Sequence, residues 1–260
     1  MNHLPLISAL TALALAGLAT DSAQAALYDR GNGLIYDDVL NITWQQDANL
    51  AASNPFGVSG INADGTMDWL TANAWIAAMN AAGYLGYSDW RLPILTPVNG
   101  ASFTLFDPAV GDFINTYNGS ADFGYNAAGL NTELGNLFYA SLGNHGICDS
   151  DGNPFGCGDQ ENPPPVQLVS TGPFVNLGNT SYWTGTTSPY NRGEGLEAWV
   201  FHFTDGGQDP NPYSDALSVW AVRAGDVAAV PEPGTYLLML TGLGLVMGAA
   251  LRGRQSGRRP

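Results

Sequence analysis

The sequence predicts an α+β fold with a twisted, mainly antiparallel sheet, two helices and long loops. Three observations predict it. Short strand-like segments flank a Gly-Asn-Gly turn at residues 31–33. An apolar stripe at helical spacing follows at residues 69–79. The last third of the predicted domain then consists of aromatic segments that alternate like strands.

The first strands lie near the start of the chain. Residues 27–30 and 34–37 are expected to pair around the glycine-rich turn, and residues 39–44 to continue the sheet. The aromatic content of 11% argues for a packed core, although Gly, Asn and Pro are abundant.

Two helices are expected. Asp68 is a suitable N-cap for the first helix, which ends near Gly83. Its inward stripe consists of Trp69, Ala72, Ile76 and Met79. The second helix is expected over Thr132–Leu142, with Gly143 after its end. Its inward residues are Leu134, Leu137, Phe138 and Leu142.

The remaining segments predict loops and strands. Residues 87–93 end in a proline, which fits a strand edge or the start of a loop, and residues 94–131 are expected to be loop-rich. Strands are expected at residues 181–186, 198–203 and 217–223, with a turn at 205–207 followed by a polar loop. In the middle strand, Trp199, Phe201 and Phe203 would share one face, and Val200 and His202 the other.

Both ends of the chain have the pattern of targeting segments. Leu4 to Ala19 is apolar and Ala23-Gln24-Ala25 fits a cleavage site, so residues 1–25 are predicted to be a signal peptide. At the other end, Pro231-Glu232-Pro233 precedes an uncharged apolar run over residues 235–251 and then four arginines. A helix of that length reaches roughly 26 Å, barely enough for a thin bilayer, and the arginines would hold its far end in the cytoplasm.

This order of features resembles the PEP-CTERM sorting signal of Gram-negative bacteria, over residues 230–260. The resemblance implies that a membrane-embedded exosortase removes the tail after export, in hosts that commonly make exopolysaccharide. An ordinary C-terminal anchor is the alternative, but it does not explain Pro-Glu-Pro. We therefore expect export through the inner membrane, membrane attachment only before the tail is removed, and a final location at the cell surface or outside the cell.

The segment between these ends, residues 26–229, has the length of one domain. It carries four arginines, no lysine and 21 acidic residues, a formal charge of −17. Such a surface repels nucleic acids and anionic lipids, because nucleic-acid affinity comes largely from basic side chains that replace counterions. Nucleic-acid binding is therefore excluded.

A second resemblance rests on five segments of the predicted domain. They are Asp29–Asp37, Asp89–Pro93, Tyr182–Thr186, Ala198-Trp199 and Val219–Arg223. Together they resemble the Lcl-type C-terminal domain, which is distantly related to the C-type-lectin-like fold. The resemblance spans most of residues 27–227, with 94–131 and 144–175 looking like insertions. It implies a C-type-lectin-like α+β fold and says little about activity, since such folds host unrelated functions.

Few residues could support catalysis. The mature chain has two histidines, His145 and His202, and contains no G-x-S-x-G nucleophile motif. We interpret His202 as a half-exposed structural residue, and pairs of acidic residues as a solvated surface. The Lcl-type domain is also distantly related to the formylglycine-generating enzymes, but the catalytic cysteines of those enzymes have no counterpart in the C-terminal strands. Arg91 and Arg223 are expected to bind carboxylates and backbone carbonyls rather than a ligand. We expect no enzyme and no required cofactor.

Cys148 and Cys157 are predicted to form a disulfide, because they lie close together in an exported chain. The loop between them is a candidate calcium site. Its oxygen ligands would be Asp149, Asp151 and Asn153, at alternate positions as in the first half of an EF-hand loop. Pro154 and Gln160 occupy positions that an EF-hand needs for glycine and glutamate, so a complete EF-hand is excluded. A solvated acidic turn is the alternative.

Exposed tryptophans could provide a carbohydrate site, because flat rings stack on the apolar faces of sugars. Trp183, Trp199 and Trp220 are the candidates, and the alternative is that all three lie in the core. Our first hypothesis is a non-catalytic surface or extracellular-matrix protein that binds exopolysaccharide or another envelope glycan. The second is a structural or protein-interaction module of the matrix that has no glycan site.

Overall fold

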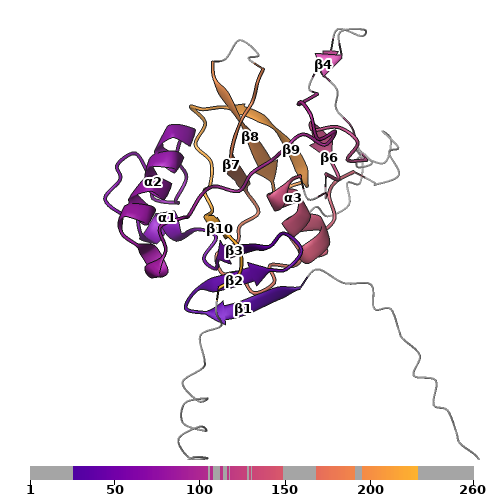
Figure 1. The fold of residues 1–260 in the computed structure, drawn as a ribbon. Helices are drawn as coiled ribbons and strands as arrows, with labels where there is room; N and C mark the ends of the chain where they lie inside the picture. The colour runs from indigo at the N-terminus through magenta and orange to yellow at the C-terminus, as the bar shows by residue number, and fades with distance from the viewer. Residues whose placement is uncertain are drawn as a thin grey trace, which may run out of the picture.

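The computed structural model describes residues 26–104, 106–107, 112–113, 116, 118–127, 129, 131–148, 168–190 and 195–227. Within them the fold is α+β, as predicted (Figure 1). The first sheet has four antiparallel strands in the order β1 (Leu27–Gly31), β2 (Leu34–Asp37), β3 (Ile42–Gln45) and β10 (Val222–Ala224). The second has the order β6 (Gly124–Tyr125), β9 (Gly207–Pro212), β8 (Glu197–His202) and β7 (Ser181–Thr187). A two-stranded sheet pairs β4 (Phe106–Asp107) with β5 (Asp112–Phe113).

The expectation of one sheet is therefore wrong, because the described strands form two four-stranded sheets and one pair. The closing segment of the domain explains the division. Ser218 exchanges backbone hydrogen bonds with β7 of the second sheet, through Ser181 and Trp183. Only a few residues later, the chain pairs with β3 as β10. The expected strand over residues 217–223 is thus a link between the two sheets that ends in a short strand.

The predicted N-terminal hairpin is confirmed, but β3 begins later than expected. The buried Asp37 carboxylate accepts hydrogen bonds from the backbone nitrogens of Val39 and Leu40, both at 3.1 Å. Asn41 then has a positive φ of 50°. A side chain that binds the backbone two and three residues ahead forms a turn, so the chain cannot extend until Ile42.

Both predicted helices are present. Asp68 caps α2 (Trp69–Ala81) by accepting a hydrogen bond from Thr71 N at 2.7 Å. Thr132 caps α3 (Glu133–Asn136), which continues as the π-helical turn η2 (Leu137–Ser141) rather than as one regular α-helix. Two short elements were not predicted, α1 (Leu50–Ser53) and the 3₁₀ turn η1 (Tyr84–Gly86). Such short helices depend on tertiary packing rather than on a periodic pattern.

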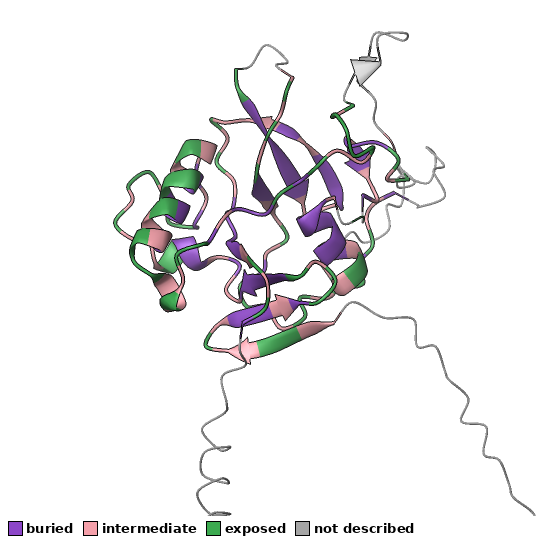
Figure 2. Ribbon diagram, viewed as in Figure 1, coloured by how far each residue is buried: buried purple, intermediate pink, exposed green. Residues whose placement is uncertain are grey.

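Strand β8 of the second sheet is buried on both faces (Figure 2). One face packs with α2 in a cluster that contains Trp75, Met79 and Trp183. The other face packs with α3, η2 and the first sheet, around Phe138 and Phe201. The predicted alternation along β8 is confirmed for Val200 in the first cluster and for Phe201 and Phe203 in the second, whereas Trp199 packs in a third cluster with Leu95.

The polar loop expected after residue 207 is instead the strand β9. Its sequence contains Pro210 and Pro212, which cannot donate backbone hydrogen bonds. They are tolerated because β6 pairs with β9 only at Gly207 and Gln208. Beyond Gln208 the far side of β9 pairs with no described strand, so the prolines lie on a sheet edge.

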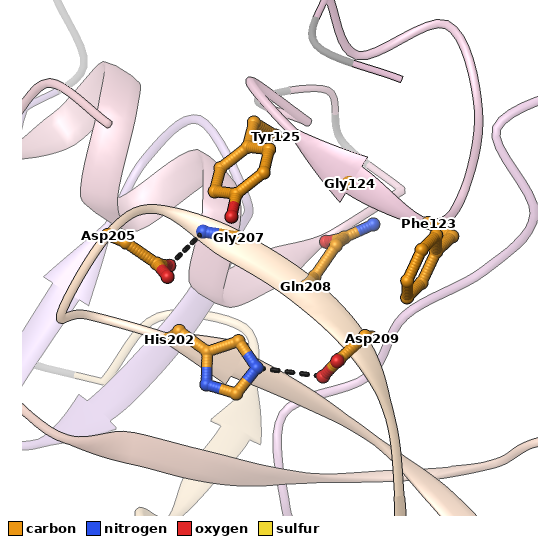
Figure 3. A pocket seen from close by; sticks show the side chains of 8 residues that line it. All are labelled: Phe123, Gly124, Tyr125, His202, Asp205, Gly207, Gln208 and Asp209. Carbon is orange, nitrogen blue, oxygen red and sulfur yellow. Dashed lines mark hydrogen bonds and ion pairs between the residues drawn. The ribbon is translucent and has the colours of Figure 1, made fainter. Parts of the chain in front are cut away.

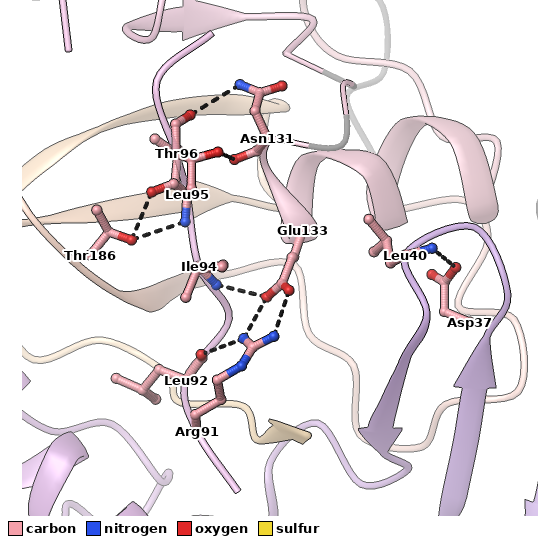
Figure 4. Close-up of polar contacts among 10 residues, drawn as sticks. All are labelled: Asp37, Leu40, Arg91, Leu92, Ile94, Leu95, Thr96, Asn131, Glu133 and Thr186. Carbon is pink, nitrogen blue, oxygen red and sulfur yellow. Dashed lines mark hydrogen bonds and ion pairs between the residues drawn. The ribbon is translucent and has the colours of Figure 1, made fainter. Parts of the chain in front are cut away.

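Arg91 and Arg223 bind carboxylates, as predicted. The Arg91 guanidinium contacts both oxygens of Glu133 at 2.8 and 2.7 Å and also donates to Leu92 O at 3.1 Å (Figure 4). Glu133 in addition accepts a hydrogen bond from Ile94 N at 2.7 Å. This pair therefore joins the start of the long loop region to α3. Arg223 binds Asp89 in the same bidentate way, at 2.9 and 3.0 Å.

The two described ends of the domain meet at the first sheet. Arg30 of β1 forms an ion pair with Asp226 at 2.6 Å. The Arg30 guanidinium also lies over the rings of Tyr28 and Tyr36, 5.1 Å from each centroid. None of the helices in the described residues is long and apolar enough to cross a membrane. The predicted signal peptide and the apolar run at 235–251 lie outside the described residues.

Candidate functional site

A small pocket opens at the edge of the second sheet, between β6 and the turn that joins β8 to β9 (Figure 3). Its volume is about 110 Å³. Two aromatic rings and four polar side chains line it, together with two glycines of the backbone. These residues are Phe123, Gly124, Tyr125, His202, Asp205, Gly207, Gln208 and Asp209. In Figure 3 the Gln208 amide lies between the two rings, and His202 and Asp209 lie below it.

His202 is fixed by hydrogen bonds to both of its ring nitrogens. Nδ1 lies 2.6 Å from Ser181 Oγ on β7, and Nε2 lies 2.7 Å from Asp209 Oδ1 on β9. Burial acts to lower the pKa of His202, but the hydrogen bond to Asp209 and the negative charges of Asp209 and Asp205 outweigh burial and raise this pKa. The half-exposed structural histidine predicted from the sequence matches its side-chain exposure of 21% and its two partners.

Ser181, His202 and Asp209 are the three residue types of a hydrolase triad. Their geometry decides whether they could act as one. In serine hydrolases the serine contacts Nε2 and the carboxylate contacts Nδ1, and here the two nitrogens have exchanged roles. Ser181 also does not line the pocket, so a ligand there would meet His202 and Asp209 but not the hydroxyl. The two hydrogen bonds hold the imidazole of β8 in place between Ser181 of β7 and Asp209 of β9.

Tyr139 of η2 joins the two sides of the pocket. Its hydroxyl donates to Gly206 O at 2.7 Å and accepts from Asn126 N at 3.1 Å. Burial raises the pKa of the Tyr139 hydroxyl, which stays protonated. Gly206 has a positive φ of 80°, and a Cβ atom there would collide with the Tyr139 hydroxyl. The π-helical turn thus fixes the β8–β9 turn relative to β6.

Gln208 connects the pocket to the loop region before β4. Its Nε2 donates to Asp122 O at 2.7 Å, while its Oε1 is buried without a hydrogen-bond partner among the described residues. The Asp122 carboxylate in turn accepts from Val98 N at 2.6 Å and from Thr104 N at 2.8 Å. The pocket wall is therefore held by buried polar contacts that reach residues 98–104.

Trp183, Trp199 and Trp220 do not form the candidate exposed stacking surface, and the alternative that all three lie in the core is confirmed. All three side chains have an exposed fraction of 0%. Trp183 donates its indole N–H to Met67 O at 2.9 Å beneath α2, and Trp220 donates to Gln45 O at 2.6 Å. The ring of Trp220 packs 4.8 Å from those of Trp44 and Phe174, where the closing segment joins the two sheets. Each tryptophan is part of the core.

The predicted disulfide and calcium site are only partly within the described residues. Cys148 is buried, and the described residues include no free cysteine. Cys157 and the proposed ligands Asp149, Asp151 and Asn153 lie outside them, so both sites stay predictions. Among the described residues, no group of three or more His, Cys, Asp or Glu side chains is arranged to hold a metal ion.

Sequence reasoning missed the pocket. Tyr125 and Gln208 belong to no motif, Asp205 was expected only as part of a turn, and the strand pairing of β6 with β9 brings Tyr125 to the other two. The one available signal was His202, a lone histidine in a strand of aromatic residues that is followed within seven positions by two aspartates.

Comparison with known proteins identifies the C-terminal tail. Residues 229–255 match the PEP-CTERM protein-sorting motif. The chain has no match among curated protein sequences or solved structures. The motif implies an exported protein that an exosortase processes and that reaches the surface or the exterior of the cell. The expected resemblance of residues 26–229 to the Lcl-type and C-type-lectin-like domains receives no support from these comparisons.

Proposed function

We propose that the folded domain of this exported protein is a non-catalytic module that binds a glycan of the envelope or the extracellular matrix through the pocket at β6, β8 and β9. One observation carries the proposal: the rings of Phe123 and Tyr125 flank a cavity whose other side chains are carboxylates, an amide and an imidazole. Aromatic rings stack on the apolar faces of sugars, and acceptors of this kind bind hydroxyl groups. The site differs from the tryptophan surface that the sequence suggested.

The size of the pocket limits the ligand. About 110 Å³ is small beside the roughly 300–1,000 Å³ of sites that enclose drug-sized molecules. It accommodates one sugar unit or the edge of one, so affinity for a single unit would be weak. A polysaccharide would bind through many copies of the protein on one chain, which suits a matrix component.

The absence of catalysis is part of the proposal. Ser181 does not line the pocket, and the ring nitrogens of His202 are reversed relative to hydrolases. The processed protein should therefore leave ester, peptide and glycoside substrates intact. Hydrolysis that is lost in Ser181→Ala would contradict this reasoning.

Glycan binding can be tested on the processed protein from its native host. Retention on a glycan array and on host exopolysaccharide should fall in Tyr125→Ala, because this change removes one wall of the pocket. Tyr28→Ala is the matched control, since Tyr28 is an exposed tyrosine of the first sheet with an exposed fraction of 43%. Equal retention of both variants and the parent protein would refute the pocket as the site.

A structural or protein-interaction module without a glycan site is the second candidate. It is favoured by the burial of the tryptophans, since only Trp69 is partly exposed and its ring stacks on Tyr213 at 4.3 Å. Cross-linking in the native matrix distinguishes the two functions. One dominant protein partner, together with no retention on any glycan, would support the second candidate.

Processing of the tail has its own test. The intact mass of the protein from its native host should correspond to a chain that lacks the apolar segment at residues 235–251. An ordinary membrane anchor would leave that segment attached, and expression in a host without exosortase should give the unprocessed mass.

A further inference from the structure

The four polar side chains of the pocket, those of His202, Asp205, Gln208 and Asp209, offer a ligand acceptors rather than donors. Both ring nitrogens of His202 are engaged by Ser181 and Asp209, and the Gln208 amide nitrogen is engaged by Asp122 O. Asp205 uses one carboxylate oxygen to accept from Gly207 N at 2.8 Å, and Asp209 uses one to contact His202. The second oxygen of each carboxylate has no hydrogen-bond partner among the described residues.

The buried amide oxygen of Gln208 is a further acceptor at the pocket. Gln208 has an exposed fraction of only 1%, and its Oε1 has no partner among the described residues. A buried acceptor without a partner costs free energy, so a ligand that brings a donor close to this pocket wall would reduce that cost. The Gln208 amide is drawn between the two aromatic rings of the pocket in Figure 3.

The charge of the pocket favours a cation over an anion. Asp205 and Asp209 face one imidazole, so the pocket is net negative whether or not His202 is protonated. The whole domain between residues 26 and 229 carries a formal charge of −17, which attracts cationic polymers and repels acidic ones. A uronic acid or a sulfated sugar would bring like charges together.

The aromatic walls favour an organic cation over a metal ion. No group of three or more potential metal-binding side chains is arranged for a metal among the described residues. The rings of Phe123 and Tyr125 present π faces, which attract an ammonium group within about 6 Å of the ring centroid. An ammonium group also supplies three donors, which matches the acceptors of the pocket.

We infer that the pocket selects a sugar with a free amino group, and that its ligand is a polysaccharide of partly or fully unacetylated amino sugars. This inference rests on the proposed glycan-binding function and specifies its substrate class. The ammonium group lies against the carboxylates of Asp205 and Asp209, on the side of the pocket nearest the buried Gln208 amide, while the sugar ring stacks on Tyr125 or Phe123. N-acetylation removes the positive charge and two of the three donors.

The test compares three soluble probes of equal length: β-1,4-linked glucosamine oligomers, the same oligomers fully N-acetylated, and glucose oligomers. Binding to the processed protein is measured by calorimetry. The glucosamine oligomers should bind about tenfold or more tighter than either other probe, a difference that roughly one charge-assisted hydrogen bond supplies. The preference should weaken as salt is raised.

Two variants decide whether the pocket is responsible for the preference for amino sugars. Asp205→Asn should reduce the preference for the amine, while Asp64→Asn should leave it unchanged. The control alters the domain charge by the same amount at an exposed residue before α2, where the carboxylate contacts only Thr66. Equal losses in both variants would mean a general charge effect and would overturn the assigned site.

The outcomes separate the inference from the function on which it rests. If the three probes bind equally and Tyr125→Ala abolishes binding, the pocket binds glycans but the amine selectivity is wrong. If no probe binds measurably but the host exopolysaccharide is retained, the amine selectivity is wrong and the glycan-binding function stands; if the host exopolysaccharide is not retained either, both proposals fail.

Discussion

The Arg91–Glu133 pair offers a direct test of how the long loop region is attached to the core. Its four hydrogen bonds join the Arg91 guanidinium to Glu133 and Leu92 O, and Glu133 to Ile94 N (Figure 4). The side chain of Glu133 is 8% exposed and that of Arg91 is 33% exposed. The pair is therefore buried on one side and solvated on the other.

The expected loss of stability on breaking the pair follows from this intermediate burial. Exposed ion pairs contribute about 0–1 kcal/mol, and removing one partner of a fully buried pair costs about 3–5 kcal/mol. We expect Glu133→Ala to lower the free energy of unfolding by about 3 kcal/mol, because it also leaves Ile94 N without its acceptor. The coupling energy between Arg91→Ala and Glu133→Ala should be about 2 kcal/mol.

The assay is a double-mutant cycle, measured by urea unfolding with tryptophan fluorescence on the four proteins. The Arg223–Asp89 pair is a matched control, since it is also bidentate but its aspartate is 52% exposed. Its coupling energy should stay below about 1 kcal/mol. A coupling at Arg91–Glu133 no larger than that of the control would refute the argument that burial makes this pair strong.

Two further predictions concern the walls of the pocket. Tyr139→Phe should lower the free energy of unfolding by about 2 kcal/mol, because Gly206 O and Asn126 N lose their common partner; thermal unfolding measures this, and an unchanged melting temperature would contradict it. The raised pKa of His202 means that its stabilising contribution is complete below its ordinary value of 6.5 and is lost as the pH rises through the folded-state pKa. Stability should thus fall from about pH 6.5 upward, and Asp209→Asn should flatten this dependence if the Asp209 charge is its cause.

The elements that local chemistry determines could be predicted from the sequence. The Gly-Asn-Gly hairpin and the Asp68 cap each rest on residues that lie within a few positions of one another, and both are confirmed. The binding of Arg91 and Arg223 to carboxylates was also predictable, because so few cations face so many anions. Which carboxylate each arginine binds was not.

The strand β9 shows where such reasoning fails. Two prolines in six residues argue against a strand, and the argument is sound for a strand that is paired on both sides. Whether β9 is paired on both sides depends on the length of β6, which is only two residues long and precedes β9 by more than 80 positions. Strand propensity depends on the neighbouring strands, which local sequence does not identify.

The pocket could not be predicted for the same reason, because it depends on which strands pair. Asp122 and Gln208 are 86 positions apart in the sequence, and their hydrogen bond forms only because β6 lies beside β9. The strong negative charge of the domain, in contrast, could be read from the sequence. With 21 acidic residues and no lysine between residues 26 and 229, a pocket placed almost anywhere on this surface would be rich in acceptors. The position of the pocket therefore follows from the topology, whereas the negative charge on which the proposed preference for a cationic ligand rests follows from the composition.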